Sequence, residues 1–187
     1  MLMAKFKVLY VCSANLCRSV TAAALMTRAL EGRSPAPEWN VMSAGLDVRP
    51  GATLPTPIAD VMVKCGIALN TQPRQLDADI VGLADLVLTA ERAQRARIVR
   101  AVPSASRRTF TIRQFGRLCA AGQEASGIKF TGVGDDLLEL AGIGRTFVQP
   151  VDRSLDDISD PTAVGTETAM WGCLSTIQDS IRDVVGE

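Results

Sequence analysis

Short apolar runs alternate with segments of helical periodicity along this chain, and this alternation constrains its fold more than any other feature. The first run, Lys7–Val11, is rich in β-branched and aromatic residues and ends at Cys12. After a short turn, apolar residues recur every three or four positions, as on one face of an amphipathic helix. These residues are Ala22, Leu25, Met26, Ala29 and Leu30. Strands alternating with helices predict an α/β protein with a parallel sheet and helices on both faces.

The same criteria place the remaining elements. Further strands are predicted at Trp39–Ser43, Ala84–Thr89 and Thr109–Ile112. Further helices are predicted at Ile58–Cys65, Glu91–Val102, Arg113–Ala121 and Thr166–Val185. Glycine and proline commonly follow helix ends. We therefore expect Gly32 to end the first helix, with Pro35 after it, and Gly66 to end the helix at Ile58–Cys65.

Two stretches lack a regular pattern. Gly45–Pro57 contains two glycines and three prolines and is predicted to be a loop. Residues 122–144 contain six glycines and are predicted to be an irregular insertion, with a short helix at Asp135–Leu140. A length of 187 residues suits a single domain over residues 1–187.

Composition excludes several classes of function. The chain contains no histidine, so neither a Ser-His-Asp triad nor a histidine-ligated metal site can be built from it. Its 20 basic and 20 acidic residues leave no charge excess that would favour nucleic acid. No apolar run is long enough to span a membrane and no signal-peptide cleavage site follows the first strand, so a cytoplasmic protein is predicted.

Five cysteines make an odd number without a CxxC pair, which argues against a disulfide framework or a zinc ribbon. We therefore predict no metal and no cofactor. Cys65, Cys119 and Cys173 lie among apolar residues and are expected to fill the core. Cys12 and Cys17 lie in a different setting, between the first strand and the first helix.

The segment Cys12–Ser19 reads Cys-Ser-Ala-Asn-Leu-Cys-Arg-Ser. A loop that wraps into a helix N-terminus directs backbone N–H groups inward, where they bind anions. A cysteine at the start of such a loop is stabilised as a thiolate, without any histidine. The planar fork of Arg18 can hold two oxygens of a phosphate, and the hydroxyl of Ser19 can donate to the thiolate.

With these features the sequence resembles the low-molecular-weight protein tyrosine phosphatase family. The segments that carry the resemblance are Cys12–Ser19, Ser43–Gly45, Arg74–Leu76, Ala84–Leu88 and Asp157–Pro161. The resemblance implies a flavodoxin-like fold, with a four-stranded parallel sheet flanked by helices. It also implies that a phosphocysteine intermediate forms during catalysis.

The resemblance assigns roles to individual residues. Cys12 would be the nucleophile, Arg18 the phosphate clamp and Asp160 the general acid, which can also activate water. A hydrogen-bond network supporting the loop would comprise Asn15, Ser19 and Ser43. The substrate-binding residues would be Ser13, Ala14, Asn15, Leu16, Cys17 and Ser19. The other acids near Asp160, which are Asp152, Asp156 and Asp157, are expected to be surface charges.

Cys17 has two interpretations. The family uses a cysteine at this position as the redox partner of the nucleophile, in a reversible disulfide that prevents over-oxidation. Alternatively, Cys17 is a small residue that packs beneath the loop.

The sequence departs from the family in three respects that matter for the site. Ala14 replaces a glycine in the loop, which raises the question of its backbone angles. Thr162 and Ala163 stand where aromatic residues often hold a phosphotyrosyl ring, and Gly45–Pro57 adds no aromatic side chain. Many family members also have a histidine behind the loop, and that support must come here from another residue. Leu16, an apolar loop residue, favours an aryl substrate over phosphoarginine.

The sequence thus predicts a phosphate-monoester hydrolase, in the first place a protein tyrosine phosphatase, whose partner is a phosphorylated protein or a small phosphate ester. One alternative is a catalytically weak phosphate-binding or regulatory domain of the same fold, and another is a phosphocysteine carrier, which would need neither Arg18 nor Asp160. An arsenate reductase would need two further cysteines near the third strand, and residues 84–102 contain none. The oligomeric state stays open.

Overall fold

Residues 5–31, 33 and 38–186 are described in a computed structural model of the chain. Four parallel strands form one sheet in the order β2-β1-β3-β4. These strands are β1 (Phe6–Cys12), β2 (Trp39–Gly45), β3 (Leu86–Thr89) and β4 (Thr109–Thr111). The predicted α/β class with a four-stranded parallel sheet is therefore confirmed. Gly32 and Pro35, the predicted end of the first helix, lie outside the described residues.

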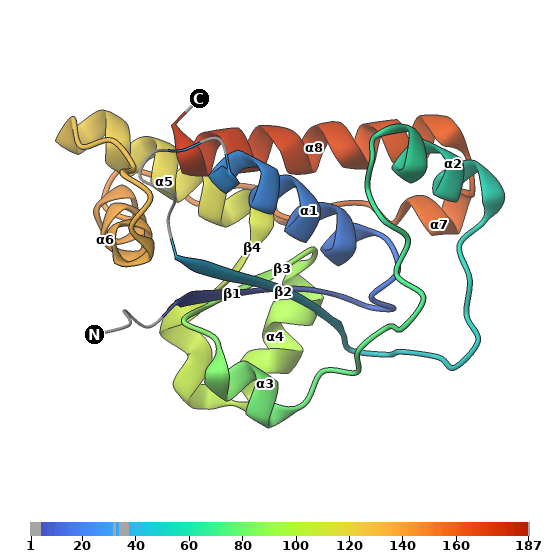
Figure 1. Cartoon of the computed structure of the whole chain (residues 1–187). Coiled ribbons are helices and arrows are strands. Elements are labelled where there is room, and N and C mark those ends of the chain that lie inside the picture. Colours follow the sequence, from blue (N-terminus) through green and yellow to red (C-terminus); the bar gives the residue numbers. More distant parts are fainter. Residues whose placement is uncertain (1–4, 32, 34–37, 187) are drawn as a thin grey trace.

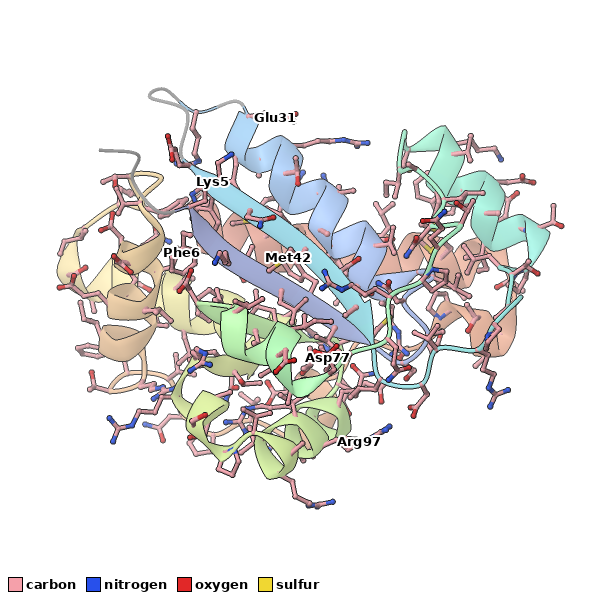
Figure 2. All side chains as sticks on the ribbon, turned by 60° about the horizontal axis from the view of Figure 1, so that its bottom comes forward. Lys5, Phe6, Glu31, Met42, Asp77 and Arg97 are labelled. Carbon is pink, nitrogen blue, oxygen red and sulfur yellow. The ribbon has the colours of Figure 1, made fainter. Side chains whose placement is uncertain are left out.

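Helices cover both faces of the sheet (Figure 1). One face carries α1 (Arg18–Glu31), α5 (Ile112–Ser126) and α8 (Glu167–Val185). The opposite face carries α3 (Ala78–Leu83) and α4 (Arg92–Ala101), which lie in front of the sheet in Figure 2. The remaining helices are α2 (Thr56–Lys64), α6 (Gly134–Gly144) and α7 (Pro161–Val164), with short 3-10 turns η1 (Pro103–Arg108) and η2 (Arg153–Leu155).

Strand β1 is buried on both faces, and its side chains alternate between two apolar clusters. Val8, Tyr10 and Cys12 pack in the cluster that includes residues of α1, α5 and α8. Leu9 and Val11 pack with residues of α3 and α4 on the other side. A central strand covered by helices on both faces has this continuous apolar character, which explains why the sequence identified it.

A third apolar cluster holds α2 against α8. It contains Ile58, Val61 and Met62 of α2 together with Met170 of α8. Cys17 belongs to the same cluster, so the packing of α2 and α8 also supports the loop that follows β1. None of the helices in the described part of the chain combines the length and the apolar character needed to cross a lipid bilayer.

The glycine-rich residues 122–144 are more regular than predicted. Helix α5 continues to Ser126 instead of ending at Ala121, and α6 spans Gly134–Gly144. A Cβ atom at Gly122 would overlap the carbonyl of Leu140. A Cβ atom at Gly144 would likewise overlap the carbonyl of Leu118. These two glycines therefore allow α5 and α6 to pack backbone against backbone, where an irregular insertion was expected.

Two further differences concern short elements. Sequence periodicity missed α3, which has only six residues and begins after Asp77, whose side chain accepts from the backbone N–H of Ile80. Strand β2 continues through Gly45, which was predicted to begin a loop. Gly45 is held by backbone hydrogen bonds to Arg74 and Leu76, so a segment distant in sequence extends the strand.

Candidate active site

The loop after β1 lies at the carboxyl ends of β1 and β3, where the winding of the sheet reverses. Cys12 ends β1 and Arg18 begins α1, so residues 13–17 connect them. The loop borders a cavity of about 470 Å³. The cavity is lined by Cys12, Ser13, Ala14, Leu16, Cys17 and Arg18 from the loop, by Asp47, Arg49, Ala52, Thr53 and Leu54, and by Asp160 and Thr162.

The thiol of Cys12 is buried at the end of β1. Its Sγ lies 3.1 Å from Oγ of Ser19, which is also buried. Within the described part of the chain, the backbone N–H groups of residues 13–17 donate no hydrogen bond. Because these donors lie between a thiol and a helix N-terminus, they are available to an anion.

Asn15 connects the loop to its surroundings. Its Nδ2 donates to Oγ of Ser19 at 3.0 Å and to Oγ of Ser43 at 2.9 Å. Its Oδ1 accepts from Nδ2 of Asn70 at 3.0 Å and from the backbone N–H of Arg74 at 2.9 Å. The structure thus brings together the three predicted support residues Asn15, Ser19 and Ser43.

Asn70 is a support residue that sequence reasoning missed. Its Nδ2 also donates to the backbone carbonyl of Asn15, at 2.8 Å. One amide therefore holds both the side chain and the main chain of Asn15. Sequence reasoning noted only that support must replace the absent histidine, and no local pattern around residue 70 indicated which residue supplies it.

The backbone angles of the loop answer the question raised by Ala14. Among the described residues other than glycine, only Asn15 has a positive φ, of 55°. Asparagine tolerates this left-handed conformation better than most residues, and Ala14 does not need it. A glycine is required instead at Gly45, because a Cβ atom there would lie 2.7 Å from the carbonyl oxygen of Ser13.

Arg18 lies between two acids, and its side chain is 2% exposed. Its Nη1 donates to the carboxylate of Glu91 and to the carbonyl of Ile158 at 2.9 Å. Its Nη2 donates to Oδ2 of Asp160 at 2.7 Å. Burial lowers the pKa of the guanidinium, but the charge of Asp160 and the hydrogen bond to Glu91 outweigh burial and raise it. Arg18 therefore stays a cation with a fixed orientation.

Asp160, predicted as the general acid, lies in the same cavity as Cys12 and Arg18. Its Oδ1 accepts from the backbone N–H of Thr162 at 3.0 Å and from its Oγ1 at 2.7 Å. This contact caps α7. A backbone hydrogen bond of 2.8 Å from Ile158 to the carbonyl of Ala90 fixes the approach of this segment to the end of β3.

Asp156 and Asp157 do not line the cavity. Contrary to the prediction of a surface charge, Asp156 is buried. It forms ion pairs with Arg92 and Arg117, which compensate the cost of burying its charge. Oδ1 of Asp157 accepts from the backbone N–H of Arg92 at 2.7 Å. These acids hold the segment before Asp160 against the start of α4.

Glu91 and Gln94 are two further site residues that sequence reasoning missed. They form a capping box at the start of α4. Nε2 of Gln94 donates to Oε1 of Glu91 and to Oγ of Ser13, both at 3.2 Å. The N-terminus of α4 is thus linked to both ends of the loop, to Ser13 directly and to Arg18 through Glu91. The available signal was an acid at the carboxyl end of the strand beside β1.

The predicted substrate-binding residues divide into two groups. Ser13, Ala14, Leu16 and Cys17 line the cavity, whereas the buried Asn15 and Ser19 are absent from its lining and support the loop. Cys17 is a free thiol that donates to Sδ of Met170 at 3.4 Å. A hydrogen bond with Cys173 and burial both raise the pKa of Cys17. These contacts fit its interpretation as a packing residue, and the disulfide with Cys12 stays a prediction.

No group of three or more acidic or cysteine side chains suited to hold a metal ion occurs in residues 5–31, 33 and 38–186. Residues 7–128 match the model of the low molecular weight phosphotyrosine protein phosphatase family. The matched part includes the loop from Cys12 to Ser19 together with Glu91, and it ends before Asp160. The chain is thus an enzyme of the phosphatase class. It belongs to the low molecular weight phosphotyrosine protein phosphatase family.

The relatives of this chain include a probable tyrosine phosphatase and an arginine phosphatase. Over 106 residues, 56% of this chain and 69% of the relative, the chain is 34% identical to a probable low molecular weight protein-tyrosine-phosphatase, EpsP, of Ralstonia solanacearum. Over 110 residues, 59% of this chain and 71% of the relative, it is 33% identical to a protein-arginine-phosphatase of Geobacillus stearothermophilus.

Solved structures share the fold. The protein tyrosine phosphatase of Entamoeba histolytica superposes with a TM-score of 0.67 at 15% identity, covering 97% of this chain and 95% of that chain. The YwlE arginine phosphatase of Geobacillus stearothermophilus superposes with a TM-score of 0.63 at 23% identity, covering 97% of this chain and 91% of that chain. The fold is therefore common to phosphatases that act on different phosphorylated residues.

Proposed function

We propose that this phosphatase hydrolyses phosphate monoesters, in the first place protein phosphotyrosine, through a phosphocysteine on Cys12. The observation that carries the proposal is the arrangement of one cavity. Its loop carries the thiol of Cys12, the cation Arg18 and the N–H groups of residues 13–17, which have no acceptor among the described residues. Asp160 lines the same cavity and contacts Arg18. These groups correspond to a phosphate-binding site, a nucleophile and an acid.

In the first step, the phosphoryl oxygens would accept hydrogen bonds from the loop N–H groups and from Arg18. The Cys12 thiolate attacks phosphorus, the bond to the ester oxygen breaks, and the carboxylic acid of Asp160 protonates that oxygen. The products are the free alcohol or phenol and an enzyme with an S–P bond. Ser19 stabilises the thiolate before the attack, because its hydroxyl lies 3.1 Å from the sulfur.

In the second step, the carboxylate of Asp160 takes a proton from a water molecule that attacks the phosphocysteine. The S–P bond breaks, inorganic phosphate leaves, and the thiolate returns with the Asp160 carboxyl protonated. Ser19 now stabilises the departing thiolate. Asp160 therefore donates a proton in the first step and accepts one in the second, and Ser19 stabilises the thiolate in both. No cofactor is needed.

The contacts of Arg18 indicate how binding and acid catalysis are coupled. A phosphoryl group at the loop would replace Asp160 on Nη2 of Arg18, while Glu91 and the carbonyl of Ile158 keep Nη1 in place. Asp160 would then be released from Arg18 and lie beside the phosphoryl group, in position to reach the ester oxygen. Substrate binding would thus prepare the acid.

The choice of phosphotyrosine rests on Leu16. This apolar side chain lines the cavity and gives an aryl group a favourable contact but offers a guanidinium no hydrogen-bond acceptor. Phosphoarginine is the second candidate, because one relative is an arginine phosphatase. We further propose that residues 1–187 act as one domain in the reducing cytoplasm, since all five cysteines are free.

The test measures hydrolysis of an aryl phosphate by the purified wild type and by Cys12→Ser, Asp160→Asn and Cys65→Ser. Cys12→Ser should lose turnover, whereas Cys65→Ser, a thiol outside the cavity, should retain it. Asp160→Asn should keep most activity only toward esters with good leaving groups. Acid quenching of Asp160→Asn followed by mass spectrometry should detect a phosphate on Cys12.

Turnover by Cys12→Ser equal to that of the wild type would exclude the phosphocysteine. Tight binding of inorganic phosphate without turnover by the wild type would favour the alternative of a phosphate-binding or regulatory domain. Phosphotyrosine and phosphoarginine peptides of the same sequence would then decide between the two substrates.

A further inference from the structure

One side of the cavity differs in character from the loop. This side, called the wall below, is formed by Asp47, Arg49, Ala52, Thr53 and Leu54. No residue lining the cavity is aromatic, so a substrate cannot be selected here by stacking of rings. Selection by the wall can therefore come from its shape, from its apolar residues Ala52 and Leu54, or from its charged residues.

The two charged residues of the wall, Asp47 and Arg49, differ in whether they form an ion pair. Asp47 forms a two-pronged ion pair with Arg97 of α4, with distances of 2.6 and 2.9 Å. The position of Arg97 on α4 is visible in Figure 2. Hydrogen bonds from Arg97 lower the pKa of Asp47. The charge of Asp47 is therefore compensated by a residue that lies outside the cavity.

Arg49 is exposed and forms no hydrogen bond or close ion pair within the described part of the chain. The other charged residues that line the cavity are already paired, because Asp160 binds Arg18 and Asp47 binds Arg97. Arg49 thus contributes a positive charge at the cavity. This charge also helps to lower the pKa of Asp47, but the hydrogen bonds of Asp47 go to Arg97, and Arg49 has no close ion pair with any described acid. An anion brought by the substrate can take this place.

We propose that Arg49 selects phosphorylated protein segments that carry an acidic side chain beside the phosphorylated residue. This inference rests on the proposed function, because it assumes that a phosphoryl group occupies the loop. The cavity, of about 470 Å³, has room for one phosphorylated side chain, so the neighbouring residues of a peptide remain at its exposed edge. A carboxylate there would meet the guanidinium of Arg49.

The ion pair between Arg49 and a substrate carboxylate should change peptide preference only modestly. Ion pairs between exposed groups are weak and salt-screened, and their geometry is not rigid. Arg49 should therefore change which peptides are preferred without being required for catalysis. Lysine at this position should preserve the preference in part, because the attraction depends mainly on charge.

The experiment compares kcat/KM for three phosphotyrosine peptides that differ only in having Glu, Gln or Lys on both sides of the phosphotyrosine. At low salt the wild type should prefer the Glu peptide over the Gln peptide by roughly twofold to fivefold. Arg49→Gln should lose this preference and Arg49→Glu should reverse it. Arg107→Gln is the matched control, because Arg107 is exposed on η1, outside the cavity lining.

A second measurement repeats the comparison at about 0.5 M NaCl, where the preference of the wild type should shrink because exposed charges are screened. Equal kcat/KM for the three peptides in the wild type would overturn the inference. So would a preference that survives in Arg49→Gln. An aryl phosphate assayed in parallel separates this failure from failure of the proposed function, since a wild type that hydrolyses neither it nor any peptide is not the proposed enzyme.

Discussion

The loop of residues 12–19 and the wall border the same cavity but are built differently. In the loop, Asn15, Arg18 and Ser19 are buried and hydrogen-bonded. In the wall, Asp47, Arg49 and Thr53 are exposed. A step that depends on orientation needs rigid groups, whereas contacts with a variable substrate do not. Under the proposed function, the rigid loop would perform the reaction and the exposed wall would influence which substrate reaches it.

The support of the loop is needed for a physical reason. Asn15 has a φ of 55°, a conformation that is uncommon for residues with a side chain. Such a conformation persists when surrounding hydrogen bonds determine it. The bonds from Asn70 and Arg74 serve this purpose. None of the five wall residues has a positive φ, so the wall needs no such support.

Of the substitutions that follow, removal of the Glu91 side chain should reduce activity most. Glu91→Ala takes a partner from Nη1 of Arg18 and an acceptor from Gln94. A misplaced guanidinium should reduce kcat/KM for an aryl phosphate by roughly 10²-fold. The inhibition constant of inorganic phosphate should rise in parallel, which loss of a helix cap alone would not cause. Glu124→Ala, at an exposed position of α5, is the control, and equal kinetics in both variants would contradict the prediction.

Loss of Asn70, which supports the same loop, should reduce activity less than loss of Glu91. Asn70→Ala leaves the backbone carbonyl and the Oδ1 of Asn15 with fewer donors, which should lower the free energy of unfolding by about 1–3 kcal/mol. We expect kcat to fall about tenfold, because the loop is then free to relax. Asn40→Ala, an exposed asparagine of β2, should change neither quantity. Unfolding in urea and steady-state kinetics measure both.

An aromatic side chain in the wall should increase the preference for phosphotyrosine. Thr53 lines the cavity, is exposed and makes no hydrogen bond within the described part of the chain. Thr53→Tyr adds a ring that a phosphotyrosine can contact, worth about 0.5–1.5 kcal/mol, which is roughly twofold to tenfold in kcat/KM. A phosphoserine peptide should gain little. Equal gains for the two peptides would show that ring contact is not the cause.

The last prediction lies outside the cavity and concerns protonation in the buried core. The hydrogen bond with Cys173 and burial raise the pKa of Cys17, and burial raises the pKa of Cys119. The folded protein therefore retains thiol protons that the unfolded chain loses above about pH 8.5. The free energy of unfolding should decrease as pH rises from about 8.5 to about 10, by at most about 1.4 kcal/mol per pH unit for each thiol.

This alkaline effect can be assigned by mutation. In Cys119→Ala the decrease should be shallower than in the wild type, because one buried thiol is gone. Carboxylates such as Asp47, whose pKa is lowered by Arg97, are already ionised in this range and should contribute nothing. Urea unfolding at a series of pH values provides the measurement. A free energy of unfolding that increases with pH over this range would contradict the prediction.

The predictability of the elements depended on their length and on the distance of their partners. The long α8 and the apolar β1 were recognised because a local period marks them. Helix α3 was missed because six residues are too few for a period. Gly122 and Gly144 were interpreted as breaks in regular structure, although they permit the close contact of α5 and α6. A glycine that packs and a glycine that ends a helix look alike in sequence.

The sequence by itself determined the parallel α/β architecture and the strand–loop–helix unit from Cys12 to Arg18, because strand and helix periods and the spacing within one loop are local properties. Only the tertiary structure decided what surrounds Arg18 and Asn15. Glu91 and Asp160 are 73 and 142 residues from Arg18, and Asn70 is 55 residues from Asn15. Their meeting depends on the strand order β2-β1-β3-β4, which brings the carboxyl ends of separate strands to one edge. A chain without histidine thus obtains its loop support from an amide whose position no local pattern records.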